Sequence, residues 1–569
     1  MAAIRHVEIC NFRGIAYLSW APKEGINALI GPGDVGKSTV LEAIDLVLGT
    51  RRSTFTDTDF HCLNVEQPIS IEVTVGDLPR ELLDLELYSA AIRGWSAVTS
   101  ELADEPGEGL EPVITLKVTV SESCEATWQL HSERLAANEL PRAMRNDHRA
   151  MIMAQRLGSA VGQHLAWGPT SSLSKLSGSG KGMGAALARA GRAARDDFTV
   201  ADAPALKPAV TAAQQVARDL AVPAALDAIA ALDPRSVNIS NGAIALHGSN
   251  HVPLRALGTG SSRLLAAGLQ AKVSRSVPVL LLDEVEHGLE PHRIARLLHY
   301  LGSKETESRP QVIMTTHSPV VLRELSAEQL CVARSDIGKT LRLERFGEAE
   351  RGLLRTHAEA FLSAAILVCE GPTEIGLMRG FDLFWSSCNQ LSLAFLGISL
   401  VDGKGTPNAQ KTALQFSAAG FEVALLRDSD VPPPQNEQTF RGRGCPVFCW
   451  RDGHATENEL FDSLPPEALP ELIAIADKHH TSTVVDTNLG SHGLNKDSIT
   501  ALRTRPTDAH RSILAKAARS GAWFKRIDFG EEVAREVVCP NFTSLTGQLP
   551  ITIQEIWTWT RRFAPPNDT

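Results

Sequence analysis

Two groups of residues in this sequence have the types and the spacing that phosphate chemistry requires. The first is the run Gly31–Thr39, which matches G-x-x-x-x-G-K-[ST] between an expected strand at 26–30 and an expected helix at 38–48. Glycines let backbone N–H groups surround phosphates, and the N-terminus of the following helix favours negative charge. Lys37 would reach the β- and γ-phosphates and Ser38 would ligate Mg²⁺. The residues expected to contact nucleotide here are Gly31, Gly33, Gly36, Lys37, Ser38 and Thr39.

Two further strand ends complete the expected nucleotide site. The apolar run 279–282 is followed by Asp283 and Glu284, and a second apolar run at 311–316 is followed by His317. We expect Asp283 to hold the Mg²⁺ shell and Glu284 to act as general base for the attacking water. His317 would sense or orient the γ-phosphate, although a single His at such a position is more often structural.

A Gly/Ser turn about 20 residues before Asp283 completes the order of motifs. Gly258, Gly260 and Ser261 open an expected helix and could cap a phosphate bound by a second protomer. The whole order resembles the ATP-binding-cassette ATPases of the recombination and chromosome-maintenance type, and the opening run 11–15 adds to the resemblance. The turn departs from the transporter signature, because Ser262 stands where that signature usually has Gln. Gln67 and 57–59 both remain candidates for the Q-loop.

The second chemical group is a set of four carboxylates in the C-terminal half. Glu370 and Glu374 follow the apolar run 364–369, and Asp428 and Asp430 follow the apolar run 422–427. Neighbouring strand ends of a parallel sheet converge on one crevice. Carboxylates gathered there would repel one another unless cations lie between them, and hard oxygen ligands suit Mg²⁺ or Mn²⁺. Two such ions can activate water and stabilise the leaving oxygen in phosphodiester cleavage.

This pair of motifs resembles the Toprim domain of topoisomerases, primases and certain nucleases. A topoisomerase needs a tyrosine nucleophile, but Tyr17, Tyr88 and Tyr300 all lie in or beside the ATPase pattern. A primase of the familiar bacterial type would want a zinc-binding module, and none is convincing in this sequence. Hydrolysis by metal-bound water needs neither feature, so we expect a nuclease.

Residues downstream could complete this site. Glu457 and Glu459 both lie at the head of an expected helix, where one could join the second metal site or both could simply favour the helix N-terminus. Residues 496–526 hold eight Lys and Arg against two Asp, which is typical of a phosphate-binding face or of a solvated helix. Lys525 follows an aromatic pair, and its ammonium could neutralise charge on the scissile phosphate. Aromatic residues at 557–563 would pack against the domain or stack on bases.

The alternation of strand and helix patterns predicts an α/β protein with two parts. We expect an ATP-binding-cassette-type head with a helical insertion, followed by a parallel sheet flanked by helices. The Ala- and Arg-rich insertion would serve dimerisation or DNA contact, or would be a solvated helical face. The expected boundaries are 1–139 and 233–345 for the head, 140–232 for the insertion, 346–362 for a connection and 363–569 for the Toprim domain.

Composition limits the remaining possibilities. The chain has 569 residues, 43% hydrophobic and 21% charged, with a formal net charge of −10. These values exclude a fibrous chain and a polycation that coats nucleic acid everywhere. Nine scattered Cys, charges in the first residues and the lack of a long apolar run predict a cytoplasmic protein without a membrane span.

An ATPase head followed by Toprim resembles the OLD (overcoming lysogenization defect) nucleases, and within them the nuclease subunit of the Gabija anti-phage system. The resemblance implies ATP binding, self-association as a homodimer or dimer of dimers, and DNA cleavage with Mg²⁺ or Mn²⁺. It implies metal ligation by Glu370, Glu374, Asp428, Asp430 and Glu457, with Lys525 as the transition-state cation. A helicase partner, the sign of the ATP effect and a defence role stay open. The alternative is a non-catalytic ATP-dependent DNA clamp or sensor with a degenerate Toprim fold.

Overall fold

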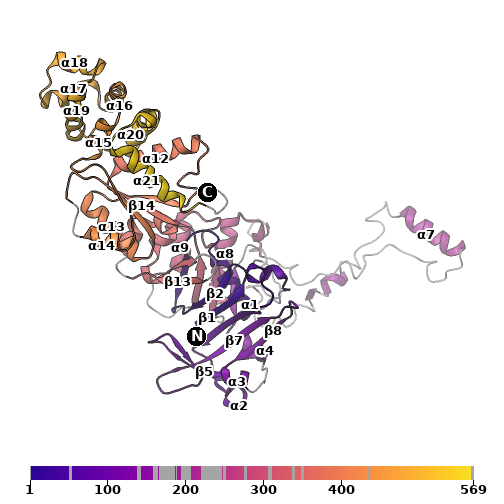
Figure 1. The fold of residues 1–569 in the computed structure, drawn as a ribbon. Helices are drawn as coiled ribbons and strands as arrows, with labels where there is room; N and C mark the ends of the chain where they lie inside the picture. Colours follow the sequence, from indigo (N-terminus) through magenta and orange to yellow (C-terminus); the bar gives the residue numbers. More distant parts are fainter. Residues whose placement is uncertain are drawn as a thin grey trace. The chain divides into compact units, whose positions relative to one another are not determined.

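The computed structural model divides the chain into two compact units (Figure 1). One unit comprises Met1–Asn27 and Ser38–Thr316, and the other comprises Ala28–Lys37 and His317–Thr569. The structure describes residues 2–49, 54–137, 143–157, 252–273, 278–304, 310–335, 340–347, 351–432 and 436–564, and the short stretches 165, 173, 186–187, 189–193, 207–219 and 246–247. No helix in these ranges is long and apolar enough to cross a bilayer.

The first unit contains an antiparallel sheet with the order β2-β1-β4-β7-β5-β6, in which β8 also pairs with β7. In β1, β2 and β4, buried apolar side chains alternate over part of the strand with more exposed ones, so one face of these strands lies in the core. The strands are β1 (Ala3–Phe12), β2 (Ile15–Trp20), β4 (Ile69–Gly76), β5 (Ile92–Ser96), β6 (Glu101–Ala103), β7 (Glu111–Val120) and β8 (Ala126–His131).

Three parallel strands of the first unit include the strand that is followed by Asp283 and Glu284. They lie in the order β11-β10-β9, with bounds β9 (Ala154–Leu157), β10 (Val279–Leu282) and β11 (Gln311–Thr315). Both β10 and β11 are buried throughout, which explains their continuous apolar runs. The helical expectation for 140–232 is wrong at Ala154–Leu157, because this four-residue segment gains its hydrogen bonds from β10 rather than from local helix propensity.

Helices of the first unit begin with α1, whose apolar residues Val40, Leu41 and Ile44 are fully buried. Most of the expected insertion at 140–232 lies outside the described residues, and its role in dimerisation stays a prediction. The helices are α1 (Lys37–Leu48), α2 (Leu85–Tyr88), α3 (Glu133–Ala137), α4 (Asn146–Arg149), α7 (Lys207–Asp219), α8 (Thr259–Val273) and α9 (Pro291–Tyr300).

The second unit includes residues 28–30 of the strand that precedes the phosphate-binding loop. Strand β3 (Ile26–Ile30) pairs in parallel with β12 (Leu330–Ser335) through Ala28–Ile30, and β12 pairs in antiparallel fashion with β13 (Leu341–Arg345). Two short helices, α10 (Pro319–Glu324) and α11 (Arg351–Thr356), follow in the same unit. Part of the segment expected to be a connection, 351–356, is therefore helical.

A four-stranded parallel sheet with the order β15-β14-β16-β17 forms the centre of the second unit. Its strands are β14 (Ala365–Cys369), β15 (Ile398–Asp402), β16 (Glu422–Arg427) and β17 (Val447–Cys449). The chain leaves β14 toward β15 and then returns past β14 to β16. Right-handed crossovers therefore place α12 (Pro372–Ser387) and α13 (Thr406–Ala418) on opposite faces. This reversal makes the ends of β14 and β16 a topological switch point, where open α/β sheets bind ligands.

Helices form most of the remaining C-terminal part, and Figure 1 shows α16, α17, α18 and α19 gathered together. Trp559 is buried, and the rings of Trp385 and Trp557 lie 4.1 Å apart, so the C-terminal aromatic residues pack within this unit. The helices are α14 (Asn436–Gly442), α15 (Thr456–Ser463), α16 (Leu469–His480), α17 (Ser482–Ser491), α18 (Lys496–Thr504), α19 (Asp508–Ser520), α20 (Ile527–Val533) and α21 (Gln548–Arg561).

Glycines allow α12 and α20 to approach closely. A Cβ added at Gly376 would lie against the carbonyl oxygen of Ile527 and 2.8 Å from the backbone nitrogen of Glu531. Both contacts are to backbone, which cannot move aside without shifting a helix. Since α12 begins directly after Glu370, this contact also fixes the orientation of the helix that carries Glu374.

We predict that Gly376→Ala lowers the free energy of unfolding by about 1–3 kcal/mol, because the added methyl group overpacks the contact between the two helices. Denaturant unfolding of the full chain, followed by tryptophan fluorescence, measures the change. Gly352→Ala in α11 is the control, because nothing lies within 4 Å of its added Cβ. Equal unfolding midpoints for the two variants would show that the α12–α20 contact does not constrain the fold.

Candidate functional site

The phosphate-binding loop has the backbone conformation that its glycines permit. Gly31 and Gly36 have φ values of +133° and +99°, and a Cβ on Gly31 would lie 2.7 Å from the carbonyl oxygen of Ala333. The Lys37 Nζ donates hydrogen bonds to the carbonyl oxygens of Gly31, at 3.0 Å, and Pro32, at 2.6 Å. The lysine therefore lies along its own loop, whose other expected contact residues, Gly33 and Thr39, belong to the same turn and helix start.

Asp283 meets Ser38, as the motif order predicts. Its Oδ1 accepts hydrogen bonds from the hydroxyls of Ser38, at 2.9 Å, and Thr315, at 2.8 Å, and its Oδ2 pairs with Nη2 of Arg156 at 2.9 Å. Burial alone would raise the pKa of this carboxyl, but the hydrogen bonds from Thr315, Ser38 and Arg156 outweigh burial and lower it. Asp283 is therefore ionised, and it lies beside the hydroxyl expected to bind Mg²⁺.

Glu284 and His317 are both exposed residues that follow parallel strands. Glu284 has a φ of +46°, a left-handed conformation that is uncommon for non-glycine residues. Its backbone N–H donates to the Thr315 hydroxyl oxygen at 2.8 Å, and its carboxylate is 57% exposed. The Glu284 carboxylate is therefore largely exposed, and it lies 3.6 Å from Nδ1 of His287. His317 lies between β11 and α10.

The turn at Gly258–Ser262 lies against the acidic strand end. Gly260 approaches the carbonyl oxygen of Gly288 so closely that no Cβ would fit, and Ser261 accepts a hydrogen bond from Nη1 of Arg293 at 3.0 Å. Arg263, one residue beyond the turn, donates to the carbonyl oxygens of Asp283 and Glu284. The sequence analysis missed Arg263, because its role depends on a backbone contact that no motif records.

Neither candidate for the glutamine loop is decided by these contacts. The carbonyl oxygen of Gln67 accepts a hydrogen bond from Asn11 at 2.6 Å, which ties the segment to the end of β1. Asp59, within 57–59, accepts from Nε of Arg13 at 2.8 Å. Both segments are therefore anchored to the opening run at 11–15.

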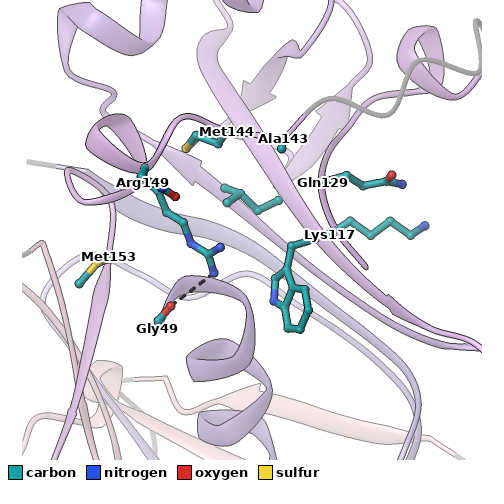
Figure 2. Close-up of a pocket in the computed structure, with 10 residues that line it drawn as sticks. Gly49, Lys117, Gln129, Ala143, Met144, Arg149 and Met153 are labelled. Carbon is teal, nitrogen blue, oxygen red and sulfur yellow. Dashed lines mark hydrogen bonds between the residues drawn. The ribbon is translucent and has the colours of Figure 1, made fainter. Parts of the chain in front are cut away.

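A cavity of about 450 Å³ lies at the opposite end of α1 from Ser38 (Figure 2). Its two basic side chains already have partners: Arg149 donates to the carbonyl oxygen of Gly49 at 3.3 Å, and Lys117 pairs with Glu72 at 2.8 Å. The cavity is therefore distinct from the nucleotide site, which lies at the N-terminal end of the helix.

The second set of carboxylates meets at the switch point of the four-stranded sheet. Cys369 of β14 is aligned with Leu426 of β16, so the residues that follow these strands are neighbours. The Glu370 carboxylate accepts hydrogen bonds from the backbone N–H of Asp428, at 2.9 Å, and from the hydroxyl of Thr406, at 2.6 Å. The structure thus brings the two acidic strand ends together.

One hydroxyl connects Glu374 with Asp428. The Thr456 Oγ1 lies 2.5 Å from Oε1 of Glu374 and 2.8 Å from Oδ1 of Asp428, and it accepts a hydrogen bond from Nε1 of Trp450 at 2.7 Å. A hydroxyl has a single proton, so it can donate to only one of these two carboxyls. The other contact requires a proton on the second carboxyl, or a cation that replaces that proton.

The pKa values of these carboxyl groups agree with this arrangement. Burial, followed by the charges of Glu370 and Glu457, raises the pKa of Glu374 to about 7 against the opposing hydrogen bond from Thr456. Burial and the charges of Glu374 and Glu370 raise the pKa of Asp428 to about 9. Without a bound cation, the group therefore holds at least one proton near neutral pH.

Asp430, Glu457 and Lys525 border this group. Asp430 forms an ion pair with Arg519, and Glu457 is buried, with its pKa raised mainly by burial and lowered by the charges of Lys525 and Arg519. The Lys525 loop is attached to α12, because the hydroxyl of Thr373 donates to the carbonyl oxygen of Phe524 at 3.1 Å. Arg519 and Lys525 therefore both act electrostatically on Glu457.

The donor set has the chemistry of a site for a hard divalent cation, but the observed conformation does not present a finished one. Searched over the described ranges, no three or more His, Cys, Asp or Glu side chains are arranged to hold a metal ion. Thr456 contacts both Glu374 and Asp428, and Arg519 forms an ion pair with Asp430. A metal ion bound here would have to replace these contacts, while the buried carboxylates would lose their excess of negative charge.

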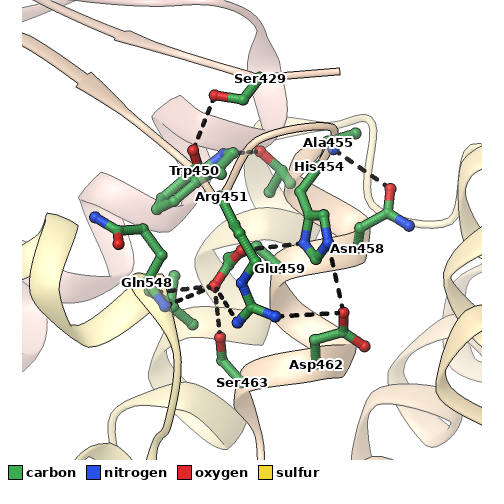
Figure 3. A network of polar contacts seen from close by, with 12 residues as sticks. Ser429, Trp450, Arg451, His454, Ala455, Asn458, Glu459, Asp462, Ser463 and Gln548 are labelled. Atoms are coloured by element: carbon green, nitrogen blue, oxygen red, sulfur yellow. Dashed lines mark hydrogen bonds and ion pairs between the residues drawn. The ribbon is translucent and has the colours of Figure 1, made fainter.

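Glu459 has a different role from Glu457, although both lie in the first turn of α15. The fully buried carboxylate of Glu459 accepts hydrogen bonds from the backbone N–H groups of Gln548, at 3.0 Å, and Leu549, at 3.1 Å, at the N-terminus of α21 (Figure 3). His454 and Ser463 also contact it, at 3.2 and 2.9 Å. Glu459 thus joins α15 to α21. Of the two acids, Glu457 is the one whose charge acts on Glu374.

Comparisons with known proteins support the ATPase part of the chain. Residues 3–136 match the family described as "AAA ATPase domain", and residues 203–323 match the family described as "AAA domain, putative AbiEii toxin, Type IV TA system". The chain therefore contains ATPase domains of the AAA type, in agreement with the expected ATP site. A search of the curated proteins finds no match.

The solved structures that match part of the chain share little sequence with it. One is the Smc head bound to the C-winged helix domain of ScpA, with 16% identity over 61% of this chain and 98% of that chain and a TM-score of 0.36. Others are the SMC head domain from Thermotoga maritima, with 12% identity over 60% and 99% and a TM-score of 0.29, and RecF–ATP, with 12% over 60% and 99% and a TM-score of 0.32.

We predict that Glu459→Gln lowers the free energy of unfolding by about 1–3 kcal/mol, because the glutamine amide cannot accept all the hydrogen bonds that the buried carboxylate accepts. Thermal unfolding of the full chain measures this loss. Glu555→Gln is the matched control, because Glu555 is exposed on α21. A similar melting temperature for both variants would mean that Glu459 does not anchor the helix.

Proposed function

We propose that this protein is an ATP-binding, divalent-metal-dependent DNA endonuclease in which an ATPase dimer controls a Toprim-type site, as in the OLD nucleases. The observation that carries the proposal is the meeting of Glu370 and Asp428 at the switch point between β14 and β16, with Glu374 joined to Asp428 through Thr456. A buried group of carboxylates with raised pKa values is typical of a functional site rather than of a solvated strand edge.

Each residue of this group has a proposed task. Glu370, Glu374, Asp428, Asp430 and Glu457 would hold Mg²⁺ or Mn²⁺, which supplies an activated water and stabilises the leaving oxygen when it is bound. Thr456 positions Glu374 and Asp428 relative to each other, and Thr406 orients Glu370. The Lys525 ammonium, on the loop anchored by Thr373, would neutralise the charge of the scissile phosphate.

The ATPase part would regulate access of DNA to this site. Asp283 and Ser38 would bind the Mg²⁺ that accompanies ATP, Glu284 would activate the attacking water, and His317 would respond to the γ-phosphate. Gly258, Gly260 and Ser261 would contribute from a second protomer, so self-association is part of the proposal. A helicase partner and a role in anti-phage defence are extensions of the family resemblance.

One observation favours a second candidate, an ATP-dependent DNA clamp or sensor without nuclease activity. Arg519 holds Asp430, and the described residues contain no finished metal site. In a clamp this ion pair would be permanent, whereas in a nuclease it must open. A clamp should bind DNA equally well in Mg²⁺ and in EDTA and leave it intact in both.

We predict that Asp428→Asn abolishes cleavage of supercoiled plasmid in Mg²⁺ or Mn²⁺ while ATP binding is retained. The amide removes one anionic oxygen from the proposed metal site without a large change in volume. A plasmid assay that crosses Mg²⁺, Mn²⁺ and EDTA with and without ATP measures the effect.

Glu422→Gln is the matched control, because Glu422 is an exposed acid at the opposite end of the same strand. It should cleave at the parental rate. Cleavage by Asp428→Asn at that rate would refute the nuclease site, and absence of cleavage by the parental chain under every condition would favour the clamp.

We predict that Glu284→Gln binds ATP but hydrolyses it at least about 10²-fold more slowly, because the amide cannot accept a proton from the attacking water. Phosphate release measures turnover, and equilibrium binding of labelled ATP measures affinity. Glu290→Gln, which removes an exposed carboxylate paired with Arg293, is the control. Undiminished hydrolysis in Glu284→Gln would exclude Glu284 as the base.

A further inference from the structure

Arg156 is a basic residue at the nucleotide site that no motif accounts for. Its Nη2 lies 2.9 Å from Oδ2 of Asp283, and the two side chains are 20% and 22% exposed. The residue belongs to β9, the edge strand that pairs in parallel with β10. This ion pair is therefore partly shielded from solvent, where a charge has a larger effect than at the surface.

The strand register explains why Arg156 faces Asp283. Arg156 is aligned with Leu281, and successive side chains of a strand point to opposite faces. Leu281 and the residue two positions later, Asp283, therefore share a face, and Arg156 lies on that face in the next strand. The contact thus follows from the pairing of β9 with β10 and not from the choice of one flexible rotamer alone.

The two carboxylate oxygens of Asp283 have different partners, and one of them contacts Arg156. Oδ1 accepts from the hydroxyls of Ser38 and Thr315, which is compatible with a Ser38 oxygen that also binds a cation. Oδ2 accepts from Arg156 alone among the described residues. The guanidinium thus stands where the expected Mg²⁺ shell would need this carboxylate, and two cations at one carboxylate repel each other.

The pairing of Arg156 has the form of an exchangeable contact. It uses one nitrogen of the guanidinium, and within the described part of the chain the buried Nε–H has no hydrogen-bond partner. Bidentate pairs are the stronger form of this interaction. Meanwhile Arg263 holds the backbone carbonyl oxygens of Asp283 and Glu284, so the strand end stays in place without Arg156.

We propose that Arg156 is a resident counter-ion of Asp283 that Mg²⁺ must displace when Mg²⁺–ATP binds. In the nucleotide-free chain it neutralises the Asp283 carboxylate and stabilises the fold through this ion pair. In the presence of ATP it sets the Mg²⁺ concentration at which the nucleotide is held, and so acts as a positioning residue through Asp283. This inference concerns the ATP site and does not depend on the proposed nuclease activity.

The test is a Mg²⁺ titration of ATP binding to the full-length protein, with a fluorescent ATP analogue at fixed concentration and protein freed of metal by EDTA. We expect Arg156→Ala to lower the Mg²⁺ concentration for half-maximal binding by about tenfold, because the competing cation is gone. Arg156→Lys, which keeps the charge, should stay within about twofold of the parental midpoint. The melting temperature of Arg156→Ala in EDTA without nucleotide should fall.

Two further variants keep the proposal falsifiable. Arg156→Gln retains a hydrogen-bond donor but not the charge, so it should shift the Mg²⁺ midpoint as Arg156→Ala does even if the alanine variant folds poorly. Arg134→Ala breaks an ion pair with Asp104 elsewhere in the same unit and should leave the midpoint unchanged. An unchanged midpoint in Arg156→Gln would reduce Arg156 to a structural role, and a higher midpoint would show that it helps to bind the nucleotide; either result overturns the proposal.

Discussion

A carboxylate at the end of a buried parallel strand cannot be left without compensation, and this constraint organises both units of the protein. Strands β10, β14 and β16 each run through the core, and the residue that directly follows each strand is acidic: Asp283, Glu370 and Asp428. Burial disfavours the charged form of each carboxyl, so a hydrogen-bond donor, a cation or a proton has to be present. The residues that supply this compensation determine what each strand end can do.

The two units compensate their buried carboxylates in opposite ways. Asp283 has two hydroxyl donors and the cation of Arg156, and its pKa is lowered, so the folded chain itself keeps the carboxylate ionised. Glu374 and Asp428 share the single hydroxyl of Thr456, and their pKa values are raised, so the folded chain does not compensate both charges. The carboxylate of the first unit is fully compensated by protein groups, whereas the carboxyls of the second unit retain a proton.

Much of this arrangement could be predicted from the sequence, because continuous apolar runs that end in acidic residues indicate buried parallel strands. The convergence of Glu370 with Asp428 follows from that pattern, and the meeting of Ser38 with Asp283 follows from it together with the phosphate-binding motif at Gly31–Thr39. The partners Arg156, Thr456 and Arg519 could not be predicted, since each reaches its acid from an element 28 or more residues away. Arg263 could not be predicted because it contacts backbone carbonyl oxygens. The strand β9 was missed for a related reason: four residues with little strand propensity adopt their conformation through a neighbouring strand.

The pair Glu457 and Glu459 shows where local sequence stops being informative. Both acids lie in the first turn of α15, where either would favour the helix N-terminus. The sequence alone does not distinguish which of them belongs to the proposed metal site. Two residues apart on a helix, they point in different directions, so only one of them can face the strand ends. The donors at the start of α21 occupy Glu459 completely, whereas the charges that act on Glu457 are those of Lys525, Arg519 and Asp430. The distinction is therefore made by the packing of α21, 90 residues further along the chain, and not by anything within the helix itself.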